Sequence, residues 1–307
     1  MRSHLRQDPT CHSLVVRLPF QEPFAADALL AFLAARGVPG VESVRGRTYS
    51  RTLRLPRGTG TARLTLPTVG EPRVVTAVLR LENAADLDVA SQRCRRLLDL
   101  DADAVRADSV LAADPALTAS VSGTPGLRVP GAVDGPEILI RAMLGQQISV
   151  AAARTAAARL TIAADERLPA PDAELTHLFP SPQAISALGA AALGGPRRRA
   201  QALCETAAAM TAGSLVVDAS REAADLTTEL VTRPGIGPWT AGYVAMRVLG
   251  DGDVLLTGDL ALRNGAAALG LPTEPAQLSR HAENWRPYRS YAGMHLWRAA
   301  PVRAGRS

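Results

Sequence analysis

The hydrophobic pattern of this 307-residue chain changes near residue 110, and that change limits the possible folds more than any other feature. Before it, apolar and polar residues alternate in short segments that end at Gly or Pro, a pattern typical of antiparallel hairpins. After it, Ala- and Leu-rich windows with helical spacing follow one another. We therefore predict a tail at 1–12, an α+β N-terminal domain at 13–110 and an all-α region at 111–307.

The α+β domain is predicted to hold a small antiparallel sheet and two helices. Its strands are expected at 14–18, 47–55, 60–67 and 73–81, and its helices at 25–36 and 86–98. Pro-rich breaks at 168–171 and 180–182 are expected to separate helices of the second region. Those helices are expected at 114–120, 136–144, 149–163, 183–192, 197–213, 221–232, 238–249, 260–269, 275–285 and 289–299.

Composition places the chain among ordinary globular proteins, with 47% hydrophobic and 21% charged residues. No run of about 18 uncharged apolar residues and no signal peptide is present, so we expect a cytoplasmic protein with no membrane partner. Cys11, Cys94 and Cys204 lie far apart and form no CxxC pair. This spacing argues against a zinc site and against an iron–sulfur cluster.

All 34 basic residues are arginine. A chain without lysine has no side-chain amine that can form a Schiff base or serve as a base of lowered pKa. The net charge of +5 and the pI near 9.7 suit a polyanionic partner, because guanidinium groups bind phosphate well. A GC-rich genome produces the same arginine bias, so charge alone does not identify the partner.

The segment 225–265 carries the most informative motif. A helix over 226–232 is interrupted by Pro-Gly-Ile-Gly, and a second helix begins at Pro238, which predicts helix, short hairpin, helix. Gly235 and Gly237 allow positive φ and close approach of another chain, and the amides at the start of the second helix point at solvent. Two interpretations are open: a site for a DNA phosphate, or an ordinary tight turn between helices.

Asp259 is the acidic residue that stands out by its position. It lies 24 residues after Gly235, at the expected start of a helix. Asp is a common N-cap, a role worth roughly 1 kcal/mol. The same carboxylate can also face a cleft beside the hairpin, so capping and catalysis are both open interpretations.

These segments resemble the helix-hairpin-helix DNA glycosylase superfamily, and within it the 3-methyladenine DNA glycosylase II group. The resemblance extends over nearly the whole chain and is carried by PGLRVPG (125–131), RAMLGQQISVA (141–151), LVTRPGIGPWTAGY (230–243), VLLTGDLALR (254–263) and WRPYRSYAGMHLW (285–297). It implies a helical glycosylase core of two subdomains with a cleft between them. It also implies a monofunctional enzyme of base excision repair, which flips out alkylated purines such as 3-methyladenine, hydrolyses the N-glycosidic bond and leaves an abasic site.

The resemblance implies roles for individual residues. Asp259 falls on the catalytic aspartate, and the amides of Gly235, Gly237 and Thr240 fall on the phosphate-binding hairpin. The implied base pocket is lined by Trp239, Tyr243 and Trp297, with Gln146 at its rim.

Two further expectations come from the same family. No cofactor is required, but a monovalent cation, Na⁺ or K⁺, often bridges hairpin carbonyls to the DNA phosphate, which here implies Val231, Arg233 and Ile236. Gln147 stands where relatives tend to place an apolar wedge, so it is expected to enter the duplex where a base is extruded. The alternative for Gln146 and Gln147 is that they cap helices.

The distribution of aromatic residues supports a base pocket independently. All three Trp and three of the four Tyr lie between 239 and 297. Trp239 and Tyr243 are four residues apart and share a helical face, whereas Trp285 and Tyr291 are expected in the core. Electron-rich rings attract a cation by roughly 0.5–2 kcal/mol, which suits purines alkylated at N3 or N7. Such a base leaves without protonation, so the site needs chiefly a carboxylate near C1′.

The absence of lysine also bears on whether such an enzyme is monofunctional or bifunctional. Bifunctional members of the superfamily form a Schiff base through a lysine at the position of Trp239, and that route is closed here. Two alternatives remain: a non-catalytic helix-hairpin-helix protein that grips DNA, and a glycosylase for deaminated or oxidised neutral bases. The expected partner is double-stranded DNA containing alkylated bases, and a monomer suffices. The N-terminal sheet is expected to be structural or to flank DNA.

Overall fold

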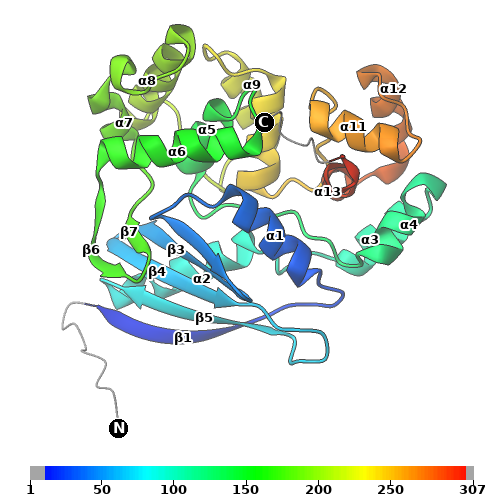
Figure 1. Ribbon diagram of the computed structural model, residues 1–307, viewed down its shortest axis with the longest axis horizontal. Helices are drawn as coiled ribbons and strands as arrows, with labels where there is room; N and C mark the ends of the chain where they lie inside the picture. The colour runs from blue at the N-terminus through cyan, green and yellow to red at the C-terminus, as the bar shows by residue number, and fades with distance from the viewer. Residues whose placement is uncertain (1–10, 302–307) are drawn as a thin grey trace.

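The computed structural model describes residues 11–301, and its N-terminal part is a five-stranded antiparallel sheet in the order β1-β5-β4-β3-β2 (Figure 1). The predicted strands are confirmed, and the four-residue β2 is added, which is too short to show an alternating pattern. Residues 1–10 of the expected tail lie outside the described residues, and His12 already belongs to the sheet. The strands are β1 (His12–Pro19), β2 (Glu42–Arg45), β3 (Thr48–Leu55), β4 (Gly58–Thr65) and β5 (Val74–Leu81).

Two helices cover this sheet, as predicted. Helix α2 (Leu87–Leu97) packs across β1, β3, β4 and β5, and α1 (Ala26–Arg36) contacts β2 and β3. The alternating apolar residues of the strands point into this core, where Leu53, Leu64 and Leu79 are at most 1% exposed. Burial of one face of the sheet therefore explains the alternation in the sequence.

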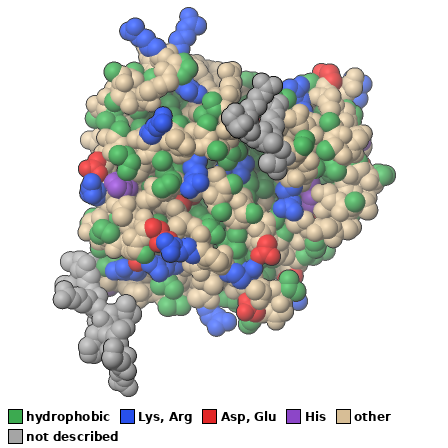
Figure 2. Space-filling view, viewed as in Figure 1, with side chains coloured by type: hydrophobic (Ala, Val, Ile, Leu, Met, Phe, Trp, Pro, Cys, Tyr) green, Lys and Arg blue, Asp and Glu red, His purple; other side chains and the backbone are tan. Residues whose placement is uncertain are grey.

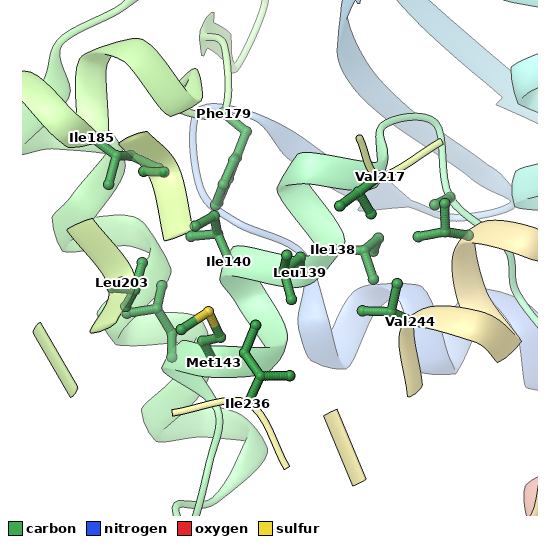
Figure 3. Packing of buried hydrophobic residues seen from close by; sticks show 14 of the residues in the cluster. Ile138, Leu139, Ile140, Met143, Phe179, Ile185, Leu203, Val217, Ile236 and Val244 are labelled. Atoms are coloured by element: carbon green, nitrogen blue, oxygen red, sulfur yellow. The ribbon is translucent and has the colours of Figure 1, made fainter. Parts of the chain in front are cut away.

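Past α2 the chain is mostly helical, and its helices pack into two bodies (Figure 1). One body packs α5 to α10 around residues such as Leu139, Leu203 and Val244 (Figure 3). The other joins α3 and α4 to α11, α12 and α13 around Leu111 and Trp285. The helices are α3 (Ala104–Ala112), α4 (Pro115–Gly123), α5 (Gly135–Leu144), α6 (Val150–Ala164), α7 (Pro182–Leu188), α8 (Arg197–Thr211), α9 (Ala223–Val231), α10 (Pro238–Val244), α11 (Leu260–Ala268), α12 (Pro275–His281) and α13 (Arg289–Ala299).

The expectation of an entirely helical second region is wrong at one place. A two-stranded hairpin, β6 (Arg167–Asp172) and β7 (Leu175–His177), replaces the expected Pro-rich break and contacts β3 and β4. Asp172 accepts hydrogen bonds from Arg63 at 2.6 Å and Thr61 at 3.2 Å, which ties the hairpin to the sheet. Its partners lie more than a hundred residues earlier in the chain, so local periodicity cannot reveal it.

Several helix boundaries also differ from the prediction. Helix α3 was not predicted and crosses the expected boundary at 110, where it packs against α4. The window 183–192 is broken at Gly189, whose φ is +73°, and the window 238–249 changes after Val244 into a π turn over Ala245–Leu249. Among the described residues, no helix has the length and apolar character needed to cross a bilayer.

Candidate active site

The hairpin between α9 and α10 is formed as predicted, but its two glycines differ. Gly235 has a φ of +76°, and a Cβ there would lie 2.8 Å from the Cβ of Ala202. Gly237 has a φ of −99°, so the expectation of positive φ is wrong for it, and an added Cβ would meet nothing within 4 Å. The fold therefore requires glycine at Gly235, whereas the backbone at Gly237 is open to a partner.

Asp259 is both a helix cap and a group that lines a cleft. Its Oδ1 accepts a hydrogen bond from the amide of Leu262 at 3.0 Å, at the start of α11. Its Oδ2 accepts a hydrogen bond from Nε1 of Trp239 at 3.0 Å. The side chain is half-buried and lines the cleft. The two interpretations of Asp259 are thus compatible, because the cap fixes the carboxylate where it remains accessible.

Three aromatic side chains form a chain of contacts that begins at this carboxylate. The rings of Trp239 and Tyr243 are stacked, with centroids 5.3 Å apart and planes 9° apart. Trp297, from α13, meets Tyr243 edge-on at 6.5 Å. Trp285 is fully buried and donates to Asp114 at 2.8 Å, which confirms that it is a core residue.

The turn between α5 and α6 brings Gln146 to the hairpin. Its Nε2 donates to the carbonyl of Gly235 at 2.8 Å and to Oγ1 of Thr240 at 2.9 Å. Gln147 is exposed in the left-handed region, with a φ of +60°. The capping alternative for the two glutamines is wrong, because Gly145 is the C-cap of α5 and Ser149 is the N-cap of α6.

The cleft has a volume of about 1050 Å³ and is lined by residues from both the N-terminal domain and the helical region. What we call the helical wall comprises Trp239, Tyr243, Asp259 and Trp297. What we call the sheet-side wall comprises Phe32, Arg36, Glu42 and Arg51. The expectation that the N-terminal sheet is only structural or DNA-flanking is therefore too narrow, since this domain builds one wall.

A buried cluster of charges supports the sheet-side wall. Glu42 accepts hydrogen bonds from Tyr49 at 2.5 Å and from Arg141 at 2.7 Å. Arg51 and Arg141 bond Glu137 at 2.6 and 2.8 Å, so two carboxylates balance two guanidinium groups. Burial alone would raise the pKa of Glu42, but Arg141 and Arg51 outweigh it and lower the pKa to about 2.

At the inner end of the helical wall, two arginines face the Tyr243 hydroxyl. Buried Arg247, in the π turn after α10, donates to this hydroxyl and to the carbonyls of Pro130 and Gly131. Arg36 approaches from the sheet-side wall. Burial favours a higher pKa for Tyr243, but Arg247 and Arg36 lower it below its usual value. The sequence analysis placed neither arginine at the site. The only sequence signal was that Arg36 is the single arginine at the end of a largely apolar helix.

The three carbonyls expected to hold a cation lie at and after the end of α9. The carbonyl of Arg233 accepts the amide of Ile236 at 3.2 Å and keeps a second lone pair for a ligand. The Arg233 guanidinium bonds the carbonyl of Ser214 at 2.9 Å and Glu229 at 3.2 Å, so its charge is already engaged. Carbonyl oxygens are hard donors, so this set fits Na⁺ or K⁺.

Comparisons with known proteins agree with this geometry. Residues 15–134 match the family model described as AlkA N-terminal domain. The chain is 35% identical to DNA-3-methyladenine glycosylase 2 of Escherichia coli, over 91% of this chain and 95% of that protein. It is 43% identical to the probable bifunctional transcriptional activator/DNA repair enzyme AlkA of Mycobacterium tuberculosis, over 92% of this chain and 56% of that protein. The chain thus spans about half the length of this mycobacterial relative.

A solved structure extends the agreement to the fold. The 3-methyladenine DNA glycosylase of Archaeoglobus fulgidus superposes with a TM-score of 0.79 at 19% identity, over 92% of this chain and 97% of that one. The similarity therefore includes both the sheet and the two helical bodies.

Proposed function

This chain belongs to the family of DNA-3-methyladenine glycosylase 2, and we propose that it hydrolyses the N-glycosidic bond of alkylated purines in DNA. The observation that carries the proposal is the position of Asp259. Its carboxylate lines the cleft beside Trp239, and its two oxygens accept hydrogen bonds from Trp239 and from the start of α11. It is thus fixed where a sugar can approach it.

The reaction follows from this arrangement. An alkylated base swung out of the duplex enters the cleft lined by Trp239, Tyr243 and Trp297, whose aromatic rings attract its positive charge. As the bond to the base breaks, positive charge develops on the sugar near C1′. Asp259 stabilises that charge and guides a water molecule to the sugar, because each of its oxygens keeps a free lone pair. The products are the free base and an abasic site, and without lysine the chain has no side-chain route to strand cleavage.

The hairpin serves to grip DNA in this proposal. The amides of Gly235, Gly237 and Thr240 lie where the turn enters α10, and the dipole of α10 favours a phosphate there. Arginines are spread over the face seen in Figure 2 and are not gathered in one patch there. Na⁺ or K⁺ on the carbonyls of Val231, Arg233 and Ile236 would add positive charge; replacing K⁺ by tetramethylammonium at constant ionic strength should then weaken DNA binding.

In this proposal, Gln147 is the wedge that enters the duplex where the base is extruded. It is exposed at the tip of a turn that Gln146 anchors to the hairpin, beside the cleft. The cleft is built from one chain, so we propose that a monomer acts on double-stranded DNA in the cytoplasm.

The test is base release from duplex DNA carrying 3-methyladenine, 7-methylguanine or hypoxanthine, with the wild type beside Asp259→Asn. Asparagine keeps the cap on α11 but removes the charge, so we expect release to fall about 100- to 1,000-fold while DNA affinity is kept. Equal release by both proteins would refute the role of Asp259. Binding without release by the wild type would indicate a non-catalytic DNA-binding protein, and release of hypoxanthine alone would indicate an enzyme for neutral bases.

A further inference from the structure

Arg154, on α6, differs from the other arginines of the cleft. Within residues 11–301, the arginines that line this space are Arg36, Arg51, Arg141, Arg154 and Arg247. The buried carboxylates of Glu42 and Glu137 balance two of them, and two more face the Tyr243 hydroxyl. Arg154 is the exposed member of the set, and no carboxylate in this part of the chain forms an ion pair with it. Its positive charge is therefore available to a ligand.

One hydrogen bond holds the Arg154 side chain in place. Its Nε donates to the carbonyl of Gly37, just after α1, at 2.7 Å. The two terminal nitrogens make no hydrogen bond within residues 11–301, so their N–H groups remain for a ligand. A guanidinium group that is already anchored loses less conformational freedom when it binds than a free one does.

The surroundings of Arg154 favour an anionic ligand. Arg154 lies in the second turn of α6, shortly after the exposed Gln147, and both residues line the cleft that Asp259 also lines. The first turn of α6 reads Val-Ala-Ala-Ala and holds no acidic residue. The positive end of the dipole of α6 lies there as well. A polyanion can thus approach this side of the cleft without meeting a negative side chain of the first turn.

Extrusion of a nucleotide brings such an anion to the cleft. In a stacked duplex the phosphates lie along the outside of the double helix, but a nucleotide whose C1′ reaches Asp259 carries its backbone with it. One DNA phosphate is proposed above to lie on the amides of the hairpin. Arg154 is anchored instead to the N-terminal domain, through Gly37, so it is placed to meet a second phosphate.

We propose that Arg154 binds a backbone phosphate flanking the extruded nucleotide and thereby stabilises the extruded state. The inference rests on the proposed glycosylase function and deepens it. A guanidinium group can bind a phosphate through two parallel hydrogen bonds. Because Arg154 lines the cleft, this contact forms when a nucleotide enters the cleft and is absent when the duplex stays fully stacked.

The test measures how DNA binding depends on salt. One duplex carries a tetrahydrofuran abasic-site analogue, which has no base to release, and the other is intact. Loss of one phosphate contact lowers the slope of log affinity against log salt concentration by about 0.9. Arg154→Met should show this change on the abasic duplex, with affinity about 10-fold weaker, and should bind the intact duplex nearly as the wild type does.

Arg159→Met is the matched control. Arg159 is an exposed arginine of the same helix that does not line the cleft, so its variant should have the slope of the wild type on both duplexes. Arg154→Lys keeps the charge and should keep most of the slope. If Arg154→Met does not fold, Arg154→Gln, which is neutral and polar, decides.

Two results would overturn the inference and leave the proposed function intact: an unchanged slope on the abasic duplex, or an equal fall on both duplexes. The second result would mean that Arg154 contacts DNA whether or not a nucleotide is extruded. A wild type that releases no alkylated base overturns the proposed function itself.

Discussion

The helical wall and the sheet-side wall of the cleft are built in different ways. In the helical wall, Asp259 and Trp239 come from one segment of the chain and meet through a single hydrogen bond. In the sheet-side wall, Glu42 and Arg141 are 99 residues apart and meet inside a buried cluster of charges. In the proposed reaction, the first wall supplies the carboxylate that acts on the sugar, and the second lines the space proposed for the base. Chemistry at this site is therefore local in sequence, whereas shape is not.

Among the changes that distinguish the two walls, Glu42→Gln should have the largest effect, and that effect should be on stability. This change removes one carboxylate and leaves Arg51 and Arg141 to share Glu137, so one buried positive charge is uncompensated. We expect the free energy of unfolding to fall by about 3–5 kcal/mol, as is typical when one partner of a buried pair is lost. Chemical denaturation measures it. Glu174→Gln is the control, since Glu174 pairs with exposed Arg45 and should change stability far less.

The same cluster of charges predicts that the stability of the protein depends on pH. Glu42 has a pKa of about 2 in the folded protein and near its usual 4.5 when unfolded. Its stabilising contribution is therefore complete above pH 4.5 and is lost as the pH falls toward 2. The stability of Glu42→Gln should vary less over this range than that of the wild type, and parallel curves would contradict the role assigned to Glu42.

A smaller effect should come from Trp239→Phe, in the helical wall. Phenylalanine keeps a ring to stack on Tyr243 but removes the hydrogen bond to Asp259. We expect base release to slow about 10-fold with little loss of stability, because one hydrogen bond to a charged group is lost at a half-exposed site. Trp297→Phe changes a ring of the same pocket without touching that bond, so it should slow release less. The reverse order would show that Trp239 acts only through stacking.

Much of the fold follows from local patterns. In β5 the buried apolar residues alternate from Val75 to Leu81, and most of the helices lie in Ala- and Leu-rich windows with helical spacing, so their type is clear from the sequence. The hairpin β6–β7 was missed because its strands are short and contain two prolines. Its stability depends on the bonds of Asp172 to Arg63 and Thr61, which no local window contains.

The residues of the site differ in the same way, because some have partners nearby in the sequence and others have distant partners. The place of Asp259 at a helix start and the shared helical face of Trp239 and Tyr243 were predicted from local spacing, whereas their roles at a site were implied by the family resemblance. Arg36 was missed because its role depends on how α1 meets α10, and nothing in the sequence near residue 36 specifies that contact. A residue whose partners are distant in the chain becomes visible as part of a site only once the fold is known.

The finest distinction lies inside the hairpin, where one chemical change should act differently at two neighbouring glycines. At Gly235 an alanine would be strained by its φ of +76° and crowded by Ala202, so Gly235→Ala should lower the free energy of unfolding, by roughly 1–3 kcal/mol. At Gly237 the backbone is ordinary and the space is open, so Gly237→Ala should leave folding unchanged or slightly stabilised. Its methyl group would instead obstruct a phosphate, weakening DNA binding roughly 3- to 10-fold. Paired measurements of unfolding and DNA affinity check both, and undiminished affinity in Gly237→Ala would mean that the hairpin is a turn and not a DNA contact.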